Sequence, residues 1–164
     1  MARCYLGLGS NLGDRAGAVH ESVKRLVSEG DIQLNRMSSL YLTRPWGRED
    51  QPEFVNAVAE VDTALEPCEL LARAKSVESD MGRKQSLRWG PREIDIDVLL
   101  YGDDVVDTDS LTIPHPRIEE RAFVLVPLLE LVPDLVHPVT GSRLAESLDG
   151  LKRRGEVSWE KLTT

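Results

Sequence analysis

Short stretches rich in apolar residues, bounded by polar and turn residues, recur four times along the chain. These stretches, residues 3–9, 31–42, 53–63 and 93–101, therefore predict β-strands. In the third stretch, small or branched apolar residues stand at every second position from 55 to 61. We expect one face of that strand to be buried and the other to be exposed.

Two further stretches carry apolar residues at helical spacing. The first, within residues 19–27, is followed by Gly30, which stands where a glycine would end a helix. The second begins at Pro67, has its apolar stripe within residues 70–81, and ends at Gly82. Each predicted helix therefore lies between two of the predicted strands.

The resulting order, strand, helix, strand, strand, helix, strand, is the ferredoxin-like pattern, in which both helices cover one face of an antiparallel sheet. Beyond this βαββαβ core, residues 103–117 predict a loop, residues 118–131 a helix interrupted around Pro127, and the remainder a mixed tail. We expect an α+β fold with additional C-terminal helices. A length of 164 residues suits one domain, covering residues 1–164.

The composition limits the partners of the chain. Its formal net charge of −8 disfavours a broad nucleic-acid surface, which is normally basic. No apolar segment approaches membrane-spanning length, so we expect no membrane insertion. The only two cysteines, Cys4 and Cys68, lack the spacing of a disulfide framework or a thiolate zinc site. We expect a cytoplasmic protein, and a monomer.

The segment GLGSNLG, residues 7–13, follows a predicted strand and opens a helix, as a dinucleotide-binding glycine loop does. The two successive strands after that helix do not fit a parallel Rossmann half. A tight turn with a helix cap is therefore the favoured interpretation.

Asp95 and Asp97 interrupt an otherwise apolar strand. On a strand they project to the same face, opposite to Ile94, Ile96 and Val98, with their carboxylates roughly 6 to 7 Å apart. Neighbouring carboxylates repel unless a cation neutralises them, and Mg²⁺ often uses one or two carboxylates together with substrate phosphates. The pair predicts a metal site; the alternative is a solvated strand face.

A concentrated basic loop precedes these aspartates. Arg83, Arg88 and Arg92 offer planar groups suited to phosphate oxygens, and Trp89 offers a flat face for a heterocycle. The alternative is a solvated loop whose arginines pair with surface acids. Beside a metal site, the loop favours a nucleotide-phosphate transfer site.

Other candidates stand singly. His115 is held between two prolines and could donate to a phosphate oxygen, although a lone histidine is as often structural. Arg121 and Phe123 could add a cation and a ring, or could be helix surface and core. Asn56, close to Phe54, either braces a loop or hydrogen-bonds a heterocycle.

Together these motifs resemble the 6-hydroxymethyl-7,8-dihydropterin pyrophosphokinase family of folate biosynthesis. The resemblance runs to about residue 134 through YLGLGSNLGD, TRPWG, QPEFVNAV, GRKQSLRWGPREIDIDVLLYG and IPHPRIEERAFVLVPL, and RWGPREIDID is its most specific part. It implies transfer of the terminal pyrophosphate of ATP to the hydroxymethyl group of the pterin, release of AMP, and two Mg²⁺ ions. The expected partners are then these two small-molecule substrates.

The resemblance also implies roles for individual residues. It assigns both metals to Asp95 and Asp97, and the catalytic set would be Arg83, Arg92, Asp95 and Asp97. ATP would contact Arg83, Arg88, Arg92, Thr112, His115 and Arg121. The pterin would contact Thr43, Pro45, Phe54, Asn56, Trp89 and Phe123. The loops at 44–52 and 82–92 would close over the substrates and exclude water.

Three positions depart from the family pattern. Gln85 stands where the family often has a second loop arginine, Phe54 replaces a tyrosine of some members, and Pro116 replaces an aromatic residue. Two rival hypotheses remain open: another two-metal nucleotidyl or phosphoryl transferase on the same fold, and a non-enzymatic ferredoxin-like sensor or RNA-binding module.

Overall fold

The computed structural model describes residues 1–43, 53–82, 93–155 and 159–162. Its strands are β1 (Ala2–Ser10), β2 (Ile32–Met37), β3 (Tyr41–Thr43), β4 (Phe54–Thr63), β5 (Asp95–Tyr101), β6 (Val106–Asp107), β7 (Thr112–Ile113) and β8 (Trp159–Lys161). Its helices are α1 (Arg15–Val27), α2 (Pro67–Asp80), α3 (Ala122–Leu131) and α4 (Leu144–Arg153), with a 3-10 helix at Ile118–Glu120.

One antiparallel sheet forms the centre of the molecule. Its strand order is β5-β1-β4-β3-β8, and β2 also pairs with β4. Strands β5, β1, β4 and β2, connected through α1 and α2, have the order of a ferredoxin-like fold. The predicted βαββαβ core is therefore confirmed, and α3 and α4 are its additional C-terminal helices.

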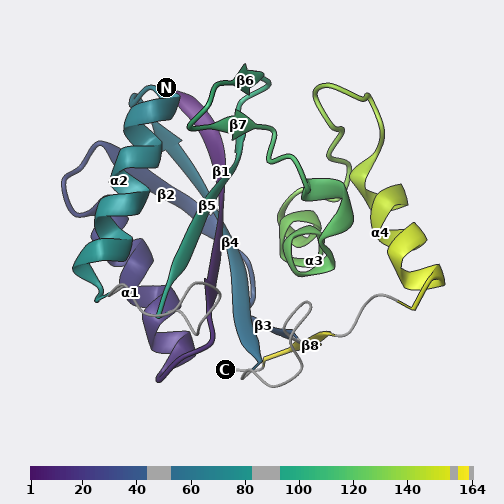
Figure 1. Ribbon diagram of the computed structural model, residues 1–164, viewed down its shortest axis with the longest axis horizontal. Helices are drawn as coiled ribbons and strands as arrows, with labels where there is room; N and C mark the ends of the chain where they lie inside the picture. The colour runs from purple at the N-terminus through teal and green to yellow at the C-terminus, as the bar shows by residue number, and fades with distance from the viewer. Residues whose placement is uncertain (44–52, 83–92, 156–158, 163–164) are drawn as a thin grey trace.

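The sheet lies between two helical layers, with α1 and α2 on one face and α3 and α4 on the other (Figure 1). Each interface contains a buried apolar cluster. The first joins alternate residues of β1, such as Leu6 and Leu8, to Val19 of α1 and Leu70 of α2. The second packs Leu125 and other residues of α3 against the opposite sheet face. Burial of these two clusters is the main source of stability of the three layers.

The expectation of one continuous strand over residues 31–42 is wrong. The chain leaves the strand at Ser38, and β2 and β3 are separate strands. The Ser38 N–H donates to the Val58 carbonyl at 2.9 Å, and the Ser38 hydroxyl oxygen accepts from the Val58 N–H at 2.9 Å. A side-chain oxygen thus replaces a backbone carbonyl in the ladder, which satisfies the strand partner while the chain bends.

The expectation that one face of the third predicted strand is exposed is also wrong. On β4 the residues of the second face, Asn56, Val58 and Glu60, are 7%, 0% and 3% exposed. The reason is tertiary: α3 packs against β4 on that face. Glu60 is tolerated there because its carboxylate accepts from the Tyr5 hydroxyl at 2.8 Å and from Arg36 at 2.8 Å.

The predicted interruption of the third helix around Pro127 does not occur. Pro127 lies inside α3, and the break falls earlier, at Arg121, between the 3-10 helix and α3. Pro127, Leu125 and Leu128 are buried. This packing stabilises the helix across the one backbone hydrogen bond that proline cannot make.

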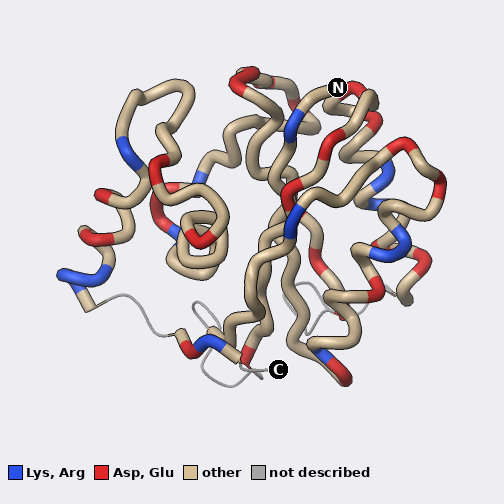
Figure 2. Tube along the Cα trace, turned by 180° about the vertical axis from the view of Figure 1, so that it is seen from behind, with Lys and Arg blue, Asp and Glu red and all other residues tan. Residues whose placement is uncertain are grey.

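The described part of the chain carries charged residues of both signs. Acidic and basic positions are interspersed along the trace rather than gathered on one face (Figure 2). Among the described residues, no helix has both the length and the apolar character needed to span a bilayer.

Candidate active site

Asp95 and Asp97 of β5 lie beside two glycines of the neighbouring strand β1. Asp95 pairs with Gly9 of β1, and Asp97 pairs with Gly7. Both aspartates are partly buried, whereas Ile94, Ile96 and Val98 are in the core, so the predicted alternation of the two faces is confirmed. Because β1 carries only glycines at these two registers, no β1 side chain lies directly beside the aspartates.

The ionisation of Asp97 depends on its burial and on the neighbouring Asp95. Burial and then the neighbouring charge of Asp95 raise the pKa of Asp97 to about 6, although Arg121 and Lys75 act in the opposite direction. The ionised pair is therefore held at an energetic cost, which a bound cation would relieve.

Glu78, a buried carboxylate whose charge acts on Asp97, was missed by the sequence analysis. It projects from α2, is 1% exposed, and its Oε2 accepts from the Ile96 N–H at 3.2 Å. Its Oε1 lies 3.1 Å from the Lys75 ammonium. Burial raises the pKa of Glu78, against the charge of Lys75, and Asp95 raises it further. A signal was present, because Glu78 follows Ala74 by four residues on the buried stripe of α2.

The segment with His115 is tied to β5. The His115 N–H donates to the Leu99 carbonyl at 3.0 Å, and the Arg117 N–H donates to His115 Nδ1 at 3.3 Å. Burial, followed by the charge of Arg121, lowers the pKa of His115 to about 4, although Asp95 opposes the shift. The imidazole is therefore neutral at pH 7, and its Nε2 carries the proton as a hydrogen-bond donor.

Arg121 connects these groups electrostatically. It stands immediately before α3, and its charge acts on both Asp97 and His115. Its guanidinium carbon lies 5.6 Å from the centre of the Phe123 ring, which is a cation–π contact. The structure thus brings together four of the residues assigned to metal and ATP, namely Asp95, Asp97, His115 and Arg121.

A polar pair lies on the other side of β1. Asn56 of β4 is also paired with Gly9, and its amide nitrogen donates to the Thr43 hydroxyl oxygen at 2.5 Å. A Cβ at Gly9 would lie 2.7 Å from Asn56 Oδ1 and 3.8 Å from a ring carbon of Phe54. A larger residue at Gly9 would therefore displace Asn56.

The role of Gly9 is a second feature that the sequence analysis missed. The turn and helix cap predicted for GLGSNLG are confirmed, since Gly13 has φ 66° and Asp14 Oδ1 accepts from the Gly17 N–H at 3.0 Å. However, Gly7 and Gly9 belong to β1 itself. Glycines inside a predicted strand were the available signal, because they often mark a close approach of another group.

Of the remaining candidates, only Thr112 lies within the described residues. Thr112 is exposed on β7, where it pairs with Asp107. Five of the predicted site residues lie outside the described residues, as does Gln85: Pro45, Arg83, Arg88, Trp89 and Arg92.

The donor set fits magnesium. Within the described ranges no group of three or more His, Cys, Asp or Glu residues is placed to hold a metal. Two carboxylates alone suit a hard cation that takes its other ligands from water and substrate phosphates, which is the usual behaviour of Mg²⁺. Burial and the charge of Asp95 raise the pKa of Asp97, so a bound cation would favour its ionised form.

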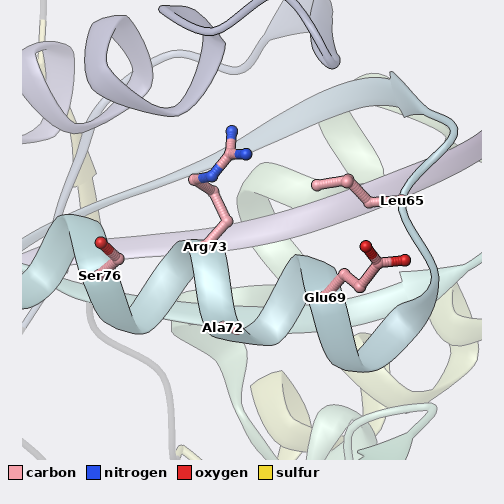
Figure 3. A pocket seen from close by; sticks show the side chains of 5 residues that line it. All are labelled: Leu65, Glu69, Ala72, Arg73 and Ser76. Atoms are coloured by element: carbon pink, nitrogen blue, oxygen red, sulfur yellow. The ribbon is translucent and has the colours of Figure 1, made fainter.

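A separate pocket of about 340 Å³ lies along α2 and the turn before it, lined by Leu65, Glu69, Ala72, Arg73 and Ser76 (Figure 3). Arg73 donates to both oxygens of Asp31 at 2.7 Å and lies 2.9 Å from Glu29. Its charge is therefore already neutralised, and none of the predicted site residues lines this pocket.

By its fold and its site, this is an α+β protein of the ferredoxin-like class that carries a pair of carboxylates on β5. The family model for 7,8-dihydro-6-hydroxymethylpterin-pyrophosphokinase matches residues 5–133, and the chain belongs to this family. It is accordingly an enzyme, a pyrophosphokinase of folate biosynthesis.

Two curated relatives match this chain over nearly their whole length. A 2-amino-4-hydroxy-6-hydroxymethyldihydropteridine pyrophosphokinase of Aquifex aeolicus is 45% identical, with 89% of this chain and 90% of that protein covered. A protein of the same name from Methylorubrum extorquens is 46% identical, with 94% of this chain and 97% of that protein covered.

Solved structures show the same fold at lower identity. An HPPK-DHPS in complex with substrates superposes with a TM-score of 0.74 at 14% identity, covering 99% of this chain and 47% of that chain. Wild-type HPPK-DHPS of Plasmodium falciparum with pteroate gives 0.73 at 18% identity, covering 95% and 44%. The chain spans about half the length of these solved chains, and the likeness concerns the fold alone.

Proposed function

We propose that this enzyme transfers the terminal pyrophosphate of ATP to the hydroxymethyl group of 6-hydroxymethyl-7,8-dihydropterin and releases AMP. The observation that carries the proposal is one row across the sheet: Asp95, then Gly9, then Asn56. The carboxylate of Asp95, which would bind a cation, and the amide of Asn56, which would hydrogen-bond a heterocycle, lie on either side of a glycine. Such a row suits a reaction that joins a phosphate chain to a ring substituent.

Asp95 and Asp97 would hold Mg²⁺, two ions in all, together with phosphate oxygens. When bound, Mg²⁺ neutralises phosphate charge and lowers the pKa of a coordinated hydroxyl group. The chain itself needs no strong base for this reaction, because positioning and charge neutralisation account for most of the catalysis of phosphoryl transfer.

Arg121 and His115 would contact the nucleotide. The guanidinium of Arg121 supplies positive charge next to Asp97, while the neutral His115 supplies an N–H donor without adding charge. Arg83, Arg88 and Arg92 are assigned to the phosphates and Thr112 to ATP on the family resemblance. Phosphate oxygens accept hydrogen bonds from all of these side chains.

The pterin ring would lie between Phe54 and Phe123, with Asn56 hydrogen-bonding its edge. Thr43 accepts from the Asn56 amide nitrogen, which fixes the orientation of that amide. Pro45 and Trp89 complete the assignment on the family resemblance. A fixed amide discriminates between ring edges because a mismatched donor or acceptor would remain unpaired.

The decisive test is an assay with MgATP and 6-hydroxymethyl-7,8-dihydropterin in which AMP and ADP are separated and quantified. We expect AMP in equal amount to pterin pyrophosphate, no AMP without the pterin, and loss of activity when Mg²⁺ is chelated. Formation of ADP, or turnover that does not depend on the pterin, would contradict the proposal and favour another two-metal transferase on this fold.

A further inference from the structure

Glu130 of α3 joins the helix to the strand β3. Its Oε1 accepts from the Tyr41 hydroxyl at 2.5 Å, and its Oε2 accepts from the Ser39 N–H at 2.8 Å. The Lys161 ammonium of β8 lies 4.0 Å from Oε1. The Glu130 carboxylate therefore contacts three segments: Ser39 between β2 and β3, the Tyr41 side chain of β3, and Lys161 of β8.

The strand held by Glu130 carries part of the candidate pterin site. Tyr41 pairs directly with Asn56, and Thr43, two residues further along β3, accepts from the Asn56 amide at 2.5 Å. Tyr41 and Thr43 therefore point to the same face of the sheet. Glu130 therefore binds the side chain of Tyr41, the residue paired with Asn56, whose amide would hydrogen-bond the pterin ring.

The helix that carries Glu130, α3, also carries Phe123, one of the two rings between which the pterin would lie. Phe123 and Glu130 are seven residues apart on α3, which is two turns, so they lie on the same side of the helix roughly 10 Å apart along its axis. Phe54 and Asn56 come from β4, against which α3 packs. The separation between α3 and the β3–β4 pair therefore sets the space between Phe123 and Phe54.

We propose that Glu130 is a positioning residue for the pterin, which holds α3 at a defined distance from β3 and β4 and so sets the gap between the Phe123 and Phe54 rings. This inference rests on the proposed function. A planar heterocycle needs a gap of defined width, and small misplacements of binding groups are costly.

The ionisation of Glu130 suits this role. Burial alone would raise its pKa, but the hydrogen bonds from Tyr41 and Ser39 and the charge of Lys161 hold the pKa of Glu130 below its ordinary value. At neutral pH the carboxylate thus accepts from both donors at once. A glutamine could accept from the Ser39 N–H through its amide oxygen and donate to the Tyr41 hydroxyl oxygen through its NH2 group, but it would carry no charge.

The experiment measures two affinities on four variants: Glu130→Ala, Glu130→Gln, Tyr41→Phe and the matched control Asp31→Ala. Asp31 also accepts two hydrogen bonds, both from Arg73 at 2.7 Å, but it joins α2 to the start of β2. The dissociation constant of a non-hydrolysable ATP analogue is measured with Mg²⁺, then that of 6-hydroxymethyl-7,8-dihydropterin in its presence. Urea unfolding reports the stability of each variant.

We expect Glu130→Ala to weaken pterin binding about tenfold or more while the ATP analogue binds within about twofold of wild type. Tyr41→Phe retains one of the two hydrogen bonds, and Glu130→Gln replaces both charge-assisted hydrogen bonds with weaker neutral ones. Each should give an intermediate loss, of roughly threefold. In turnover the Michaelis constant for the pterin should rise more than kcat falls. Asp31→Ala should lower stability without this selectivity.

Four results distinguish the possibilities. Unchanged pterin affinity in Tyr41→Phe and in folded Glu130→Ala would overturn the positioning role, as would an equal loss for both ligands matching that of Asp31→Ala. Failure of the wild-type protein to bind the pterin would instead contradict the proposed function. Selective loss of pterin affinity, in proportion to the hydrogen bonds removed, supports the inference.

Discussion

Asp97→Asn should make the metal-free enzyme more stable at pH 8 although it destroys the proposed metal site. Asparagine has nearly the shape of aspartate but carries no charge. In the wild-type protein, burial and the charge of Asp95 raise the pKa of Asp97 from 3.8 to about 6. Above that pH the folded state must hold an ionised carboxylate in an unfavourable place.

The magnitude follows from the shift in pKa. A difference of about two units at about 1.4 kcal/mol each gives on the order of 3 kcal/mol. Between pH 4 and pH 6 the folded state binds more protons at Asp97 than the unfolded state does, so this contribution to stability is present at low pH and is lost as the pH rises through about 6. We therefore expect the variant to exceed wild type by roughly 2–3 kcal/mol at pH 8 and to match it near pH 4.

The comparison must be made between variant and wild type at each pH, because His115 has the opposite effect. Its pKa is lowered to about 4, so the folded state binds fewer protons there than the unfolded state, and stability is lost as the pH falls below about 6.5. The two contributions of Asp97 and His115 partly cancel in wild type. The difference between Asp97→Asn and wild type isolates the aspartate.

Urea unfolding with a chelator present, at pH 4.5 and pH 8, measures the two differences. Added Mg²⁺ should then stabilise wild type more than the variant, because only the wild type keeps both carboxylates. A variant that is less stable than wild type at pH 8 without metal would refute the argument, as would an equal difference at both pH values.

Two other predictions concern neighbouring parts of the structure. Gly9→Ala should raise the Michaelis constant for the pterin about tenfold, because its Cβ would lie 2.7 Å from Asn56 Oδ1. Gly7→Ala is the control, since its Cβ would lie 3.4 Å from Leu99 and should leave that constant nearly unchanged; equal effects in steady-state kinetics would contradict the role of Gly9. Leu125→Ala, at a position that is 0% exposed, should lower the free energy of unfolding by about 3 kcal/mol without changing the fold, and a loss below about 1 kcal/mol in urea unfolding would show that α3 contributes little to the core.

The sequence was sufficient for features that depend on neighbours along the chain. The alternation of Ile94, Asp95, Ile96 and Asp97 predicted both the strand and the face that carries the carboxylates, and the structure confirms it. The order of strands and helices predicted the ferredoxin-like core for the same reason. Periodicity is a local property, and it is written directly in the residues.

Features that depend on packing between distant segments were not predicted. The pattern of β4 predicted that one strand face, with Asn56, Val58 and Glu60, is exposed. These residues are buried because α3 packs on β4. Likewise the position of Glu78 on the buried stripe of α2 does not reveal its partner, which is a backbone N–H of β5.

The sequence by itself therefore determined the order of the core strands and helices and the chemical groups available for catalysis. The tertiary structure decided which groups meet: Gly9 between Asp95 and Asn56, and Glu130 across from Tyr41. The physical reason is that these partners are separated by up to 89 residues, so their proximity arises from sheet register and helix docking rather than from any local pattern.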